Sequence, residues 1–114
     1  MAFLRRRSKS AVEIHLEAEV APPPPIAQAS ARQPCRVRGI ITRMKSRPSS
    51  VGLPSLAVQV SDDSGTVTAV WTGRRSLGGL KLGGVIELEG VPVLVAGKLE
   101  FLNPMYTLVP AEAP

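Results

Sequence analysis

Three groups of basic side chains in this 114-residue chain have positions suited to contacting phosphate groups. They are Arg43, Lys45 and Arg47, then Arg74 and Arg75, and finally Lys98. The first group alternates with other residues, so an extended strand would place its three side chains on one face. Antiparallel strands after it would bring Arg47 close to Arg74 and Arg75. Such a cluster favours a polyanion as ligand, and ordinary solubilising charge is the alternative.

Neutral hydrogen-bonding residues fall next to these cations. In residues 55–61 and 66–72 apolar and polar side chains alternate, and the polar positions point outward in a strand. These positions hold Gln59, Thr68 and Thr72. Arg36 and Arg38 are left out of the contact set, because glutamates on a neighbouring strand can pair with them. The solvent face can therefore bind phosphates and hydrogen-bonding groups, and it holds no side chain suited to catalysis.

Aromatic residues are few in the strand region, which limits base stacking. Trp71 shares parity with Val67 and Ala69, which predicts a core position, and the same reasoning places Phe101 in the core. Tyr106 follows a proline and either presents its hydroxyl outward as a contact or caps one end of the fold. Affinity for a nucleic acid would come mainly from phosphate contacts.

Catalytic and metal-binding patterns are absent from the sequence. The single histidine, His15, lies among glutamates, and Asp62 and Asp63 are adjacent in a turn that needs such residues. The glycine pairs after the third strand lack the Gly-Lys-Ser/Thr ending of a phosphate loop. The one cysteine, Cys35, gives no disulfide and no metal-ligand spacing. We predict no enzyme, no cofactor and no metal site.

The elements that position these residues are short strands. Two alternating segments flank an Asp-Asp-Ser-Gly turn at residues 62–65, which is a hairpin pattern. The first strand is long and contains Gly39, where a missing side chain lets a strand bulge and coil enough to serve both halves of a small barrel. The expected strands are Cys35–Arg47, Ser55–Ser61, Thr66–Thr72, residues 85–95 and residues 98–109. They predict an all-β fold, a five-stranded Greek-key barrel of the OB-fold type, and a five-stranded meander of the SH3 kind is the alternative.

Charge and composition limit the class of partner. The net charge is +5, and residues 32–109 hold ten Lys/Arg against five Asp/Glu, so the excess lies on the strand region. A basic surface favours nucleic acid or acidic lipid. A single cysteine fits a reducing compartment, and no apolar run has the length of a signal peptide or a membrane span. We expect a soluble, cytoplasmic protein that contacts no membrane and no small-molecule substrate.

The N-terminal region differs in kind from the rest. An apolar i, i+4 stripe predicts a short amphipathic helix, and its members are Val12, Leu16 and Val20. The prolines at 22–25 then form a semi-rigid spacer. We divide the chain into an N-terminal arm at residues 1–31, the barrel at residues 32–110 and a disordered C-terminus at residues 111–114. The arm either docks on the barrel or binds a protein partner through residues 10–25.

Four segments together resemble a known family. They are Val37-Arg38-Gly39-Ile40-Ile41, Val60-Ser61-Asp62-Asp63-Ser64-Gly65, Leu80-Lys81-Leu82-Gly83-Gly84 leading into Gly90, and Asn103-Pro104-Met105-Tyr106. The combination resembles OB-fold modules of the anticodon-binding superfamily, above all the wedge domain of the branch-migrating helicase RecG and the small stand-alone OB-fold proteins of actinobacteria. The resemblance implies a single-stranded or branched nucleic-acid ligand. No helicase motor follows here, which implies binding alone, and Thr72 replaces the family's usual second aromatic at the end of the third strand.

The expected function follows from these patterns. We expect one OB-fold barrel with a short helical N-terminal arm that binds single-stranded or branched DNA, or RNA, with little sequence specificity. The expected contact residues are Arg43, Lys45, Arg47, Gln59, Thr68, Thr72, Arg74, Arg75, Lys98 and Tyr106. The alternative is a protein–protein interaction module that uses the N-terminal helix and the polyproline segment.

Overall fold

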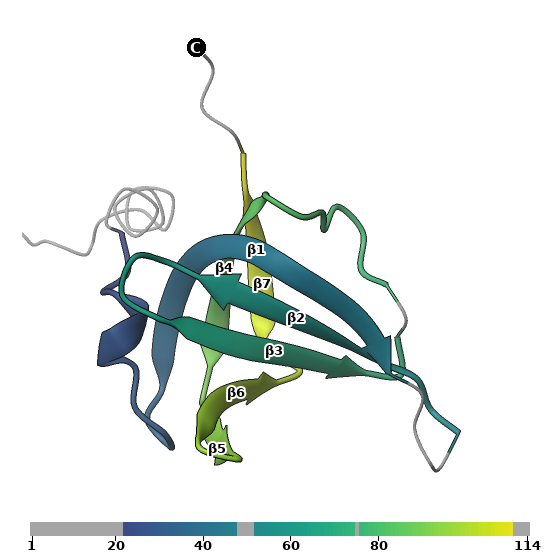
Figure 1. Ribbon diagram of the computed structural model, residues 1–114, viewed down its shortest axis with the longest axis horizontal. Coiled ribbons are helices and arrows are strands. Elements are labelled where there is room, and N and C mark those ends of the chain that lie inside the picture. Colours follow the sequence, from purple (N-terminus) through teal and green to yellow (C-terminus); the bar gives the residue numbers. More distant parts are fainter. Residues whose placement is uncertain (1–21, 48–51, 75, 111–114) are drawn as a thin grey trace, which may run out of the picture.

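Strands account for most of the residues that the computed structural model describes, which are 22–47, 52–74 and 76–110 (Figure 1). The elements are η1 (Ile26–Gln28), β1 (Cys35–Arg47), β2 (Ser55–Ser61), β3 (Thr66–Thr72), β4 (Val85–Gly90), β5 (Val93–Val95), β6 (Lys98–Leu102) and β7 (Met105–Val109). The all-β prediction is confirmed, and the one helical element in the described part of the chain is the 3-10 turn η1. The predicted N-terminal helix and the predicted disordered C-terminus lie outside the described residues. No helix of the described part is long and apolar enough to cross a membrane.

The strands form one seven-stranded mixed sheet in the order β5-β6-β3-β2-β1-β4-β7. All neighbouring pairs are antiparallel except β3 and β6, which are parallel. The prediction of a closed five-stranded barrel is wrong on two counts, because the sheet has seven strands and is not closed into a barrel. Pro92 and Pro104 lie at the breaks that divide the expected strands 85–95 and 98–109 in two, and proline has no N–H to continue a ladder.

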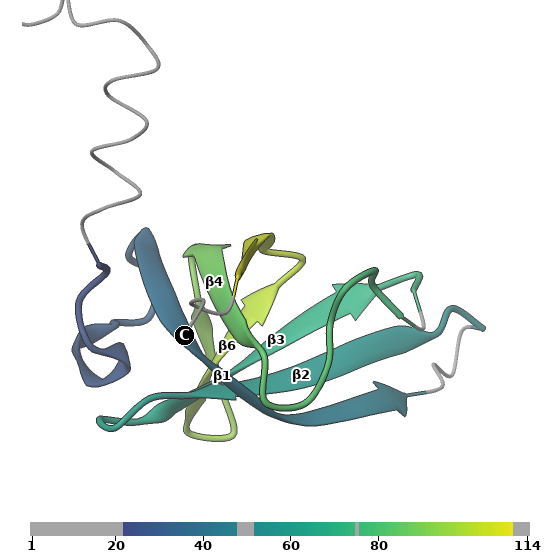
Figure 2. The ribbon, with the colours of Figure 1, turned by 90° about the horizontal axis from the view of Figure 1, so that it is seen from above.

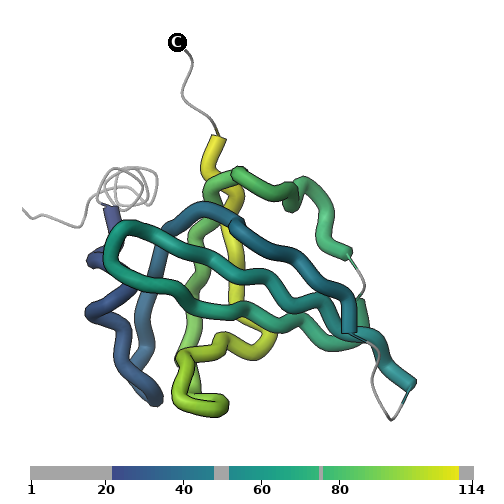
Figure 3. The backbone as a smooth tube through the Cα atoms, in the orientation of Figure 1, coloured from purple at the N-terminus to yellow at the C-terminus, as the bar shows by residue number. Residues whose placement is uncertain are grey.

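The long strand β1 joins the β2–β3 side of the sheet to the β4–β7 side, as its length predicts (Figure 3). Residues 35–40 pair with β4, and the remainder from residue 40 onward pairs with β2. Gly39 lies where β1 passes between these partners, and a Cβ there would be 2.5 Å from the carbonyl oxygen of Ser61. Only glycine fits this approach without moving the backbone of β2.

A β-bulge in β1 changes which residues face the core. The register passes from Ile41 opposite Val60 to Arg43 opposite Gln59, so Thr42 is the extra residue. Because successive residues of a strand point to opposite faces, the extra residue reverses the parity. Before the bulge the odd-numbered residues Val37, Gly39 and Ile41 are buried. After it the odd-numbered basic residues share the outward face with Gln59.

The core lies within the curve of the sheet, and η1 packs against it at one edge (Figure 2). Trp71 and Phe101 are 5% and 1% exposed, which confirms their predicted burial. The indole Nε1–H of Trp71 donates a hydrogen bond to the carbonyl oxygen of Pro104 at 3.0 Å, which satisfies its one polar group. Ile26 of η1 is also buried, at 3% exposure, so this part of the predicted arm packs on the sheet.

The turn between β2 and β3 is held by Asp62. Its carboxylate accepts hydrogen bonds from the Ser64 hydroxyl at 2.6 Å, from the Ser64 and Gly65 backbone N–H groups at 2.7 and 3.0 Å, and from the Ile26 N–H at 2.9 Å. These bonds, the Ser64 hydroxyl first, lower the pKa of Asp62 from 3.8 to about 2. Asp62 therefore joins the hairpin turn to η1, and its carboxylate has a structural task.

Candidate nucleic-acid interface

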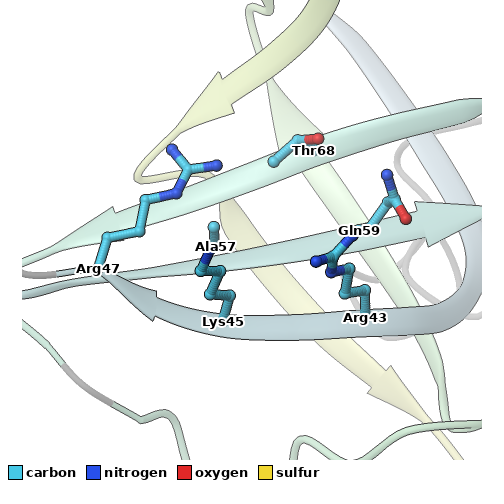
Figure 4. Close-up of a pocket in the computed structure, with 6 residues that line it drawn as sticks. All are labelled: Arg43, Lys45, Arg47, Ala57, Gln59 and Thr68. Atoms are coloured by element: carbon cyan, nitrogen blue, oxygen red, sulfur yellow. The ribbon is translucent and has the colours of Figure 1, made fainter.

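Three strands contribute side chains to a hollow on the outward side of the sheet (Figure 4). Its volume is about 240 Å³, and it is lined by Arg43, Lys45, Arg47, Ala57, Gln59 and Thr68. Five of these six are among the predicted contact residues. Small-molecule clefts usually measure roughly 300–1,000 Å³ and are mostly apolar, so a hollow edged by three cations is better suited to part of a larger polar ligand.

The pairing of the strands explains why these side chains meet. Arg43 is opposite Gln59, and Gln59 is opposite Thr68, so the three form one row across β1, β2 and β3. The next row contains Lys45 and Ala57, with Val70 on β3. Ala57 and Val70 are buried even though they face outward, and they give this side of the sheet an apolar floor. We call the surface formed by these two rows and Arg47 the basic face.

The electrostatic environment separates these cations from the other arginines of β1. Arg38 lies opposite Glu87, donates to its carboxylate from Nε at 2.7 Å and also contacts it from Nη2. Arg36 lies 3.7 Å from the same carboxylate, so the expected pairing with β4 is confirmed. Within the described part of the chain, the basic face has no ion pair to any of its three cations. Their charge is available to a ligand.

Three of the predicted contact residues end or follow β3. Thr72 is exposed and lies in the row of Arg47, but its N–H donates to Asn103 Oδ1 at 3.0 Å and its hydroxyl lies 3.3 Å from the Asn103 amide nitrogen. Arg74 is exposed two residues farther on and does not line the hollow. The predicted convergence with Arg75 falls outside the described residues, because Arg75 is not among them.

The other two predicted contacts lie farther away. Lys98 is exposed at the start of β6 and does not line the hollow. Tyr106 is half-buried and packs on the core, where its ring meets Trp71 edge to face with the centroids 5.5 Å apart and the planes at 72°. The structure therefore places Tyr106 with the core and not with the basic face.

Sequence reasoning missed two features of this surface. Ala57 forms part of the floor, and its small side chain leaves room for the hollow between Lys45 and β3. Glu100 on β6 is opposite Thr68 and so extends the row that begins with Arg43. The alternation of β2 could have identified Ala57, whereas the pairing of β6 with β3 carries no local sequence signal.

A second hollow, of about 680 Å³, lies near the proline segment. Its wall includes residues 22–24, and the exposed apolar side chains of Val91, Leu102 and Met105 also line it. Arg36 and Glu89 supply its charged groups. No group of three or more His, Cys, Asp or Glu side chains in the described part of the chain could hold a metal ion.

Comparisons of the chain with protein-family models, with curated proteins and with solved structures gave no match. Function therefore has to be inferred from the geometry of the two surfaces described above.

Proposed function

We propose that this protein binds single-stranded or branched nucleic acid, DNA or RNA, through the basic face, with little sequence preference and without catalysis. The observation that carries the proposal is the line of three cations along β1, Arg43, Lys45 and Arg47, which have no ion pair in the described part of the chain and lie beside outward hydrogen-bonding groups. Alternate residues of a strand are roughly 6.6 Å apart. Such a row can follow the phosphates of an extended strand, while Gln59 and Thr68 meet the sugars and bases.

The strand connections support an architecture related to the OB-fold. β6 and β7 are consecutive in the chain and are separated by Asn103 and Pro104 alone. β6 pairs parallel with β3 and β7 pairs antiparallel with β4, so the two segments together would act as one broken strand joining both parts of the sheet. In that interpretation the basic face corresponds to the side on which such folds hold oligonucleotides.

Phosphate contacts would supply most of the affinity. Trp71, Phe101 and Tyr106 all pack in or against the core, so no aromatic ring among the described residues is offered for base stacking on this face. Three phosphate contacts with a slope near −0.7 each predict that affinity falls about 20-fold between 50 and 200 mM salt.

Fluorescence anisotropy of a labelled single-stranded oligonucleotide at several salt concentrations tests this proposal. The double variant Lys45→Gln/Arg47→Gln should bind more weakly, and its salt slope should fall by about 1.4, the amount expected for two lost contacts. Arg32→Gln/Lys81→Gln removes the same two residue types from positions outside the hollow, and it should bind nearly as well as the unaltered protein. Equal effects of both variants, or no binding at micromolar protein in low salt, would refute the proposal.

A protein-interaction module is the second candidate, and the hollow beside the proline segment favours it. Its exposed apolar side chains and residues 22–24 fit a partner bound next to the predicted N-terminal helix. Such binding would depend mainly on apolar contact, so it would survive salt that abolishes electrostatic binding. Retention of a partner at 0.5 M salt by the intact protein, lost in Leu102→Ser/Met105→Ser, would favour this function.

A further inference from the structure

A line of hydrogen-bonding side chains crosses the sheet along the row of the basic face that begins with Arg43. Gln59 is opposite Thr68 on β3, and Thr68 is opposite Glu100 on β6. The next residue pair, Ala69 and Phe101, is buried in the core, so Thr68 and Glu100 share the outward side. Strands lie about 4.8 Å apart, and the three side chains therefore form a stripe about 10 Å long.

The carboxylate of Glu100 is the exceptional member of this stripe. It is half-buried, and in the described part of the chain it has no hydrogen bond or ion pair. A negative charge here repels phosphates, whereas the three cations on β1 attract them. A bound strand would therefore place its phosphates over β1 and direct its bases across β2 and β3 toward Glu100.

The chemistry of the three groups limits what they can recognise. An ionised carboxylate only accepts hydrogen bonds, whereas the Gln59 amide and the Thr68 hydroxyl both donate and accept. Cytosine presents an amino group at N4, which suits a glutamate acceptor, while thymine and uracil present a carbonyl oxygen at the same position. That oxygen would face the Glu100 carboxylate with no proton between them.

We propose that Glu100 accepts a hydrogen bond from the exocyclic amino group of a base, so that an otherwise sequence-tolerant site prefers cytosine over uracil at one position. This inference rests on the proposed function, because it needs a strand bound on the basic face. It adds a specificity-determining residue to that function and fixes the direction in which the bases point.

Competition between oligo-dC and oligo-dU of equal length tests the inference, because these pyrimidines differ in their hydrogen-bonding edge and not in ring size or in a methyl group. The unaltered protein should prefer oligo-dC roughly three- to tenfold. Glu100→Gln should bind oligo-dU more tightly and lose most of the preference, since an amide both donates and accepts. The matched control Glu89→Gln removes the same charge from exposed Glu89, which lines the other hollow, and it should keep the preference.

The outcomes separate the inference from the proposed function. Salt-dependent binding with equal affinity for the two oligonucleotides would overturn the role of Glu100 and leave the proposed function standing. An equal gain of affinity for both in Glu100→Gln would also overturn it, because simple repulsion would then explain the residue. Absence of binding to either oligonucleotide would refute both proposals. Circular dichroism and the urea midpoint of each variant establish that it is folded.

Discussion

The two halves of β1 carry basic residues on the same outward side but use them differently. In the first half, Arg36 and Arg38 lie beside β4, and both form ion pairs with the Glu87 carboxylate. In the second half, the three cations lie beside neutral residues of β2. The first half, which contains Gly39, is packed against its neighbours. The second half presents a surface that is available to a ligand.

This difference shows that basic residues acquire a role from the strand next to them. Arg38 and Arg43 are both arginines on the outward side of one strand, yet one is opposite a glutamate and the other opposite Gln59. Sequence counts of Lys and Arg give these residues equal weight. The register of the neighbouring strand separates a structural ion pair from an available charge.

The largest expected effect is at Gly39, in the first half. Gly39→Ala would place a Cβ 2.5 Å from a backbone oxygen of β2, and overpacking of this kind costs about 3 kcal/mol. Urea unfolding followed by Trp71 fluorescence measures the loss. Gly78→Ala is the control, because nothing lies within 4 Å of its added Cβ. Equal stability of the two variants would contradict the close approach of β1 and β2.

Ile26 gives the next largest effect. Ile26→Ala removes a buried side chain that η1 packs against the sheet, and it should cost about 2–3 kcal/mol of unfolding free energy. Met44, in the second half of β1, is 36% exposed, so Met44→Ala should cost less than about 1 kcal/mol. Similar losses in the two variants would show that η1 is packed against the sheet no more tightly than the second half of β1.

A pair of arginine variants tests the comparison directly. Arg38→Gln should lower stability by up to about 1 kcal/mol, because it leaves the mostly buried Glu87 with a weaker partner, and should leave oligonucleotide affinity unchanged. Arg43→Gln should leave stability within about 0.5 kcal/mol and should weaken binding. Anisotropy and urea titrations on both proteins give the two quantities. The reverse assignment would show that the bound strand lies along β4.

The smallest expected effect concerns pH and Asp62. Its pKa in the folded protein, about 2, lies below the ordinary value of 3.8. The stability that it contributes is present above pH 4 and is lost as the pH falls toward 2. The unaltered protein should therefore lose stability more steeply across this interval than Asp62→Asn. Parallel unfolding midpoints would mean that the turn does not depend on the carboxylate.

Local patterns were sufficient for the first three strands. β1, β2 and β3 begin and end where alternation and turn residues predict, because a hairpin is determined by contacts close in sequence. The breaks at Pro92 and Pro104 were also readable in principle, since proline cannot donate to a ladder. The open, seven-stranded sheet could not be predicted from the sequence, because the parallel pairing of β6 with β3 depends on contacts between distant segments.

The candidate site was predictable to a similar degree. The shared parity of Arg43, Lys45 and Arg47 placed them on one face of a strand, and in the structure they line one hollow. Val37 and Ile41 are also odd-numbered, yet they are apolar and buried, whereas the odd-numbered basic residues face outward. This change from apolar to basic residues at odd positions was the sequence signal of the bulge at Thr42. Tyr106 could not be placed from sequence, because its contact with Trp71 joins segments that are 35 residues apart.

The position of β1, β2 and β3 within the sheet also determines what binding would cost in entropy. The backbone beneath the basic face is already held in ladders, because β2 pairs with both β1 and β3 along its length and β3 also pairs with β6 at residues 68–70, while the basic half of β1 pairs with β2. Ordering a flexible backbone costs about 1–2 kcal/mol per residue, and an ordered sheet avoids that cost on binding. The remaining loss of entropy would fall on the ligand and on the long cationic side chains. A nucleic-acid strand that binds here must adopt the shape of the sheet, because the sheet has little freedom to adopt the shape of the nucleic acid.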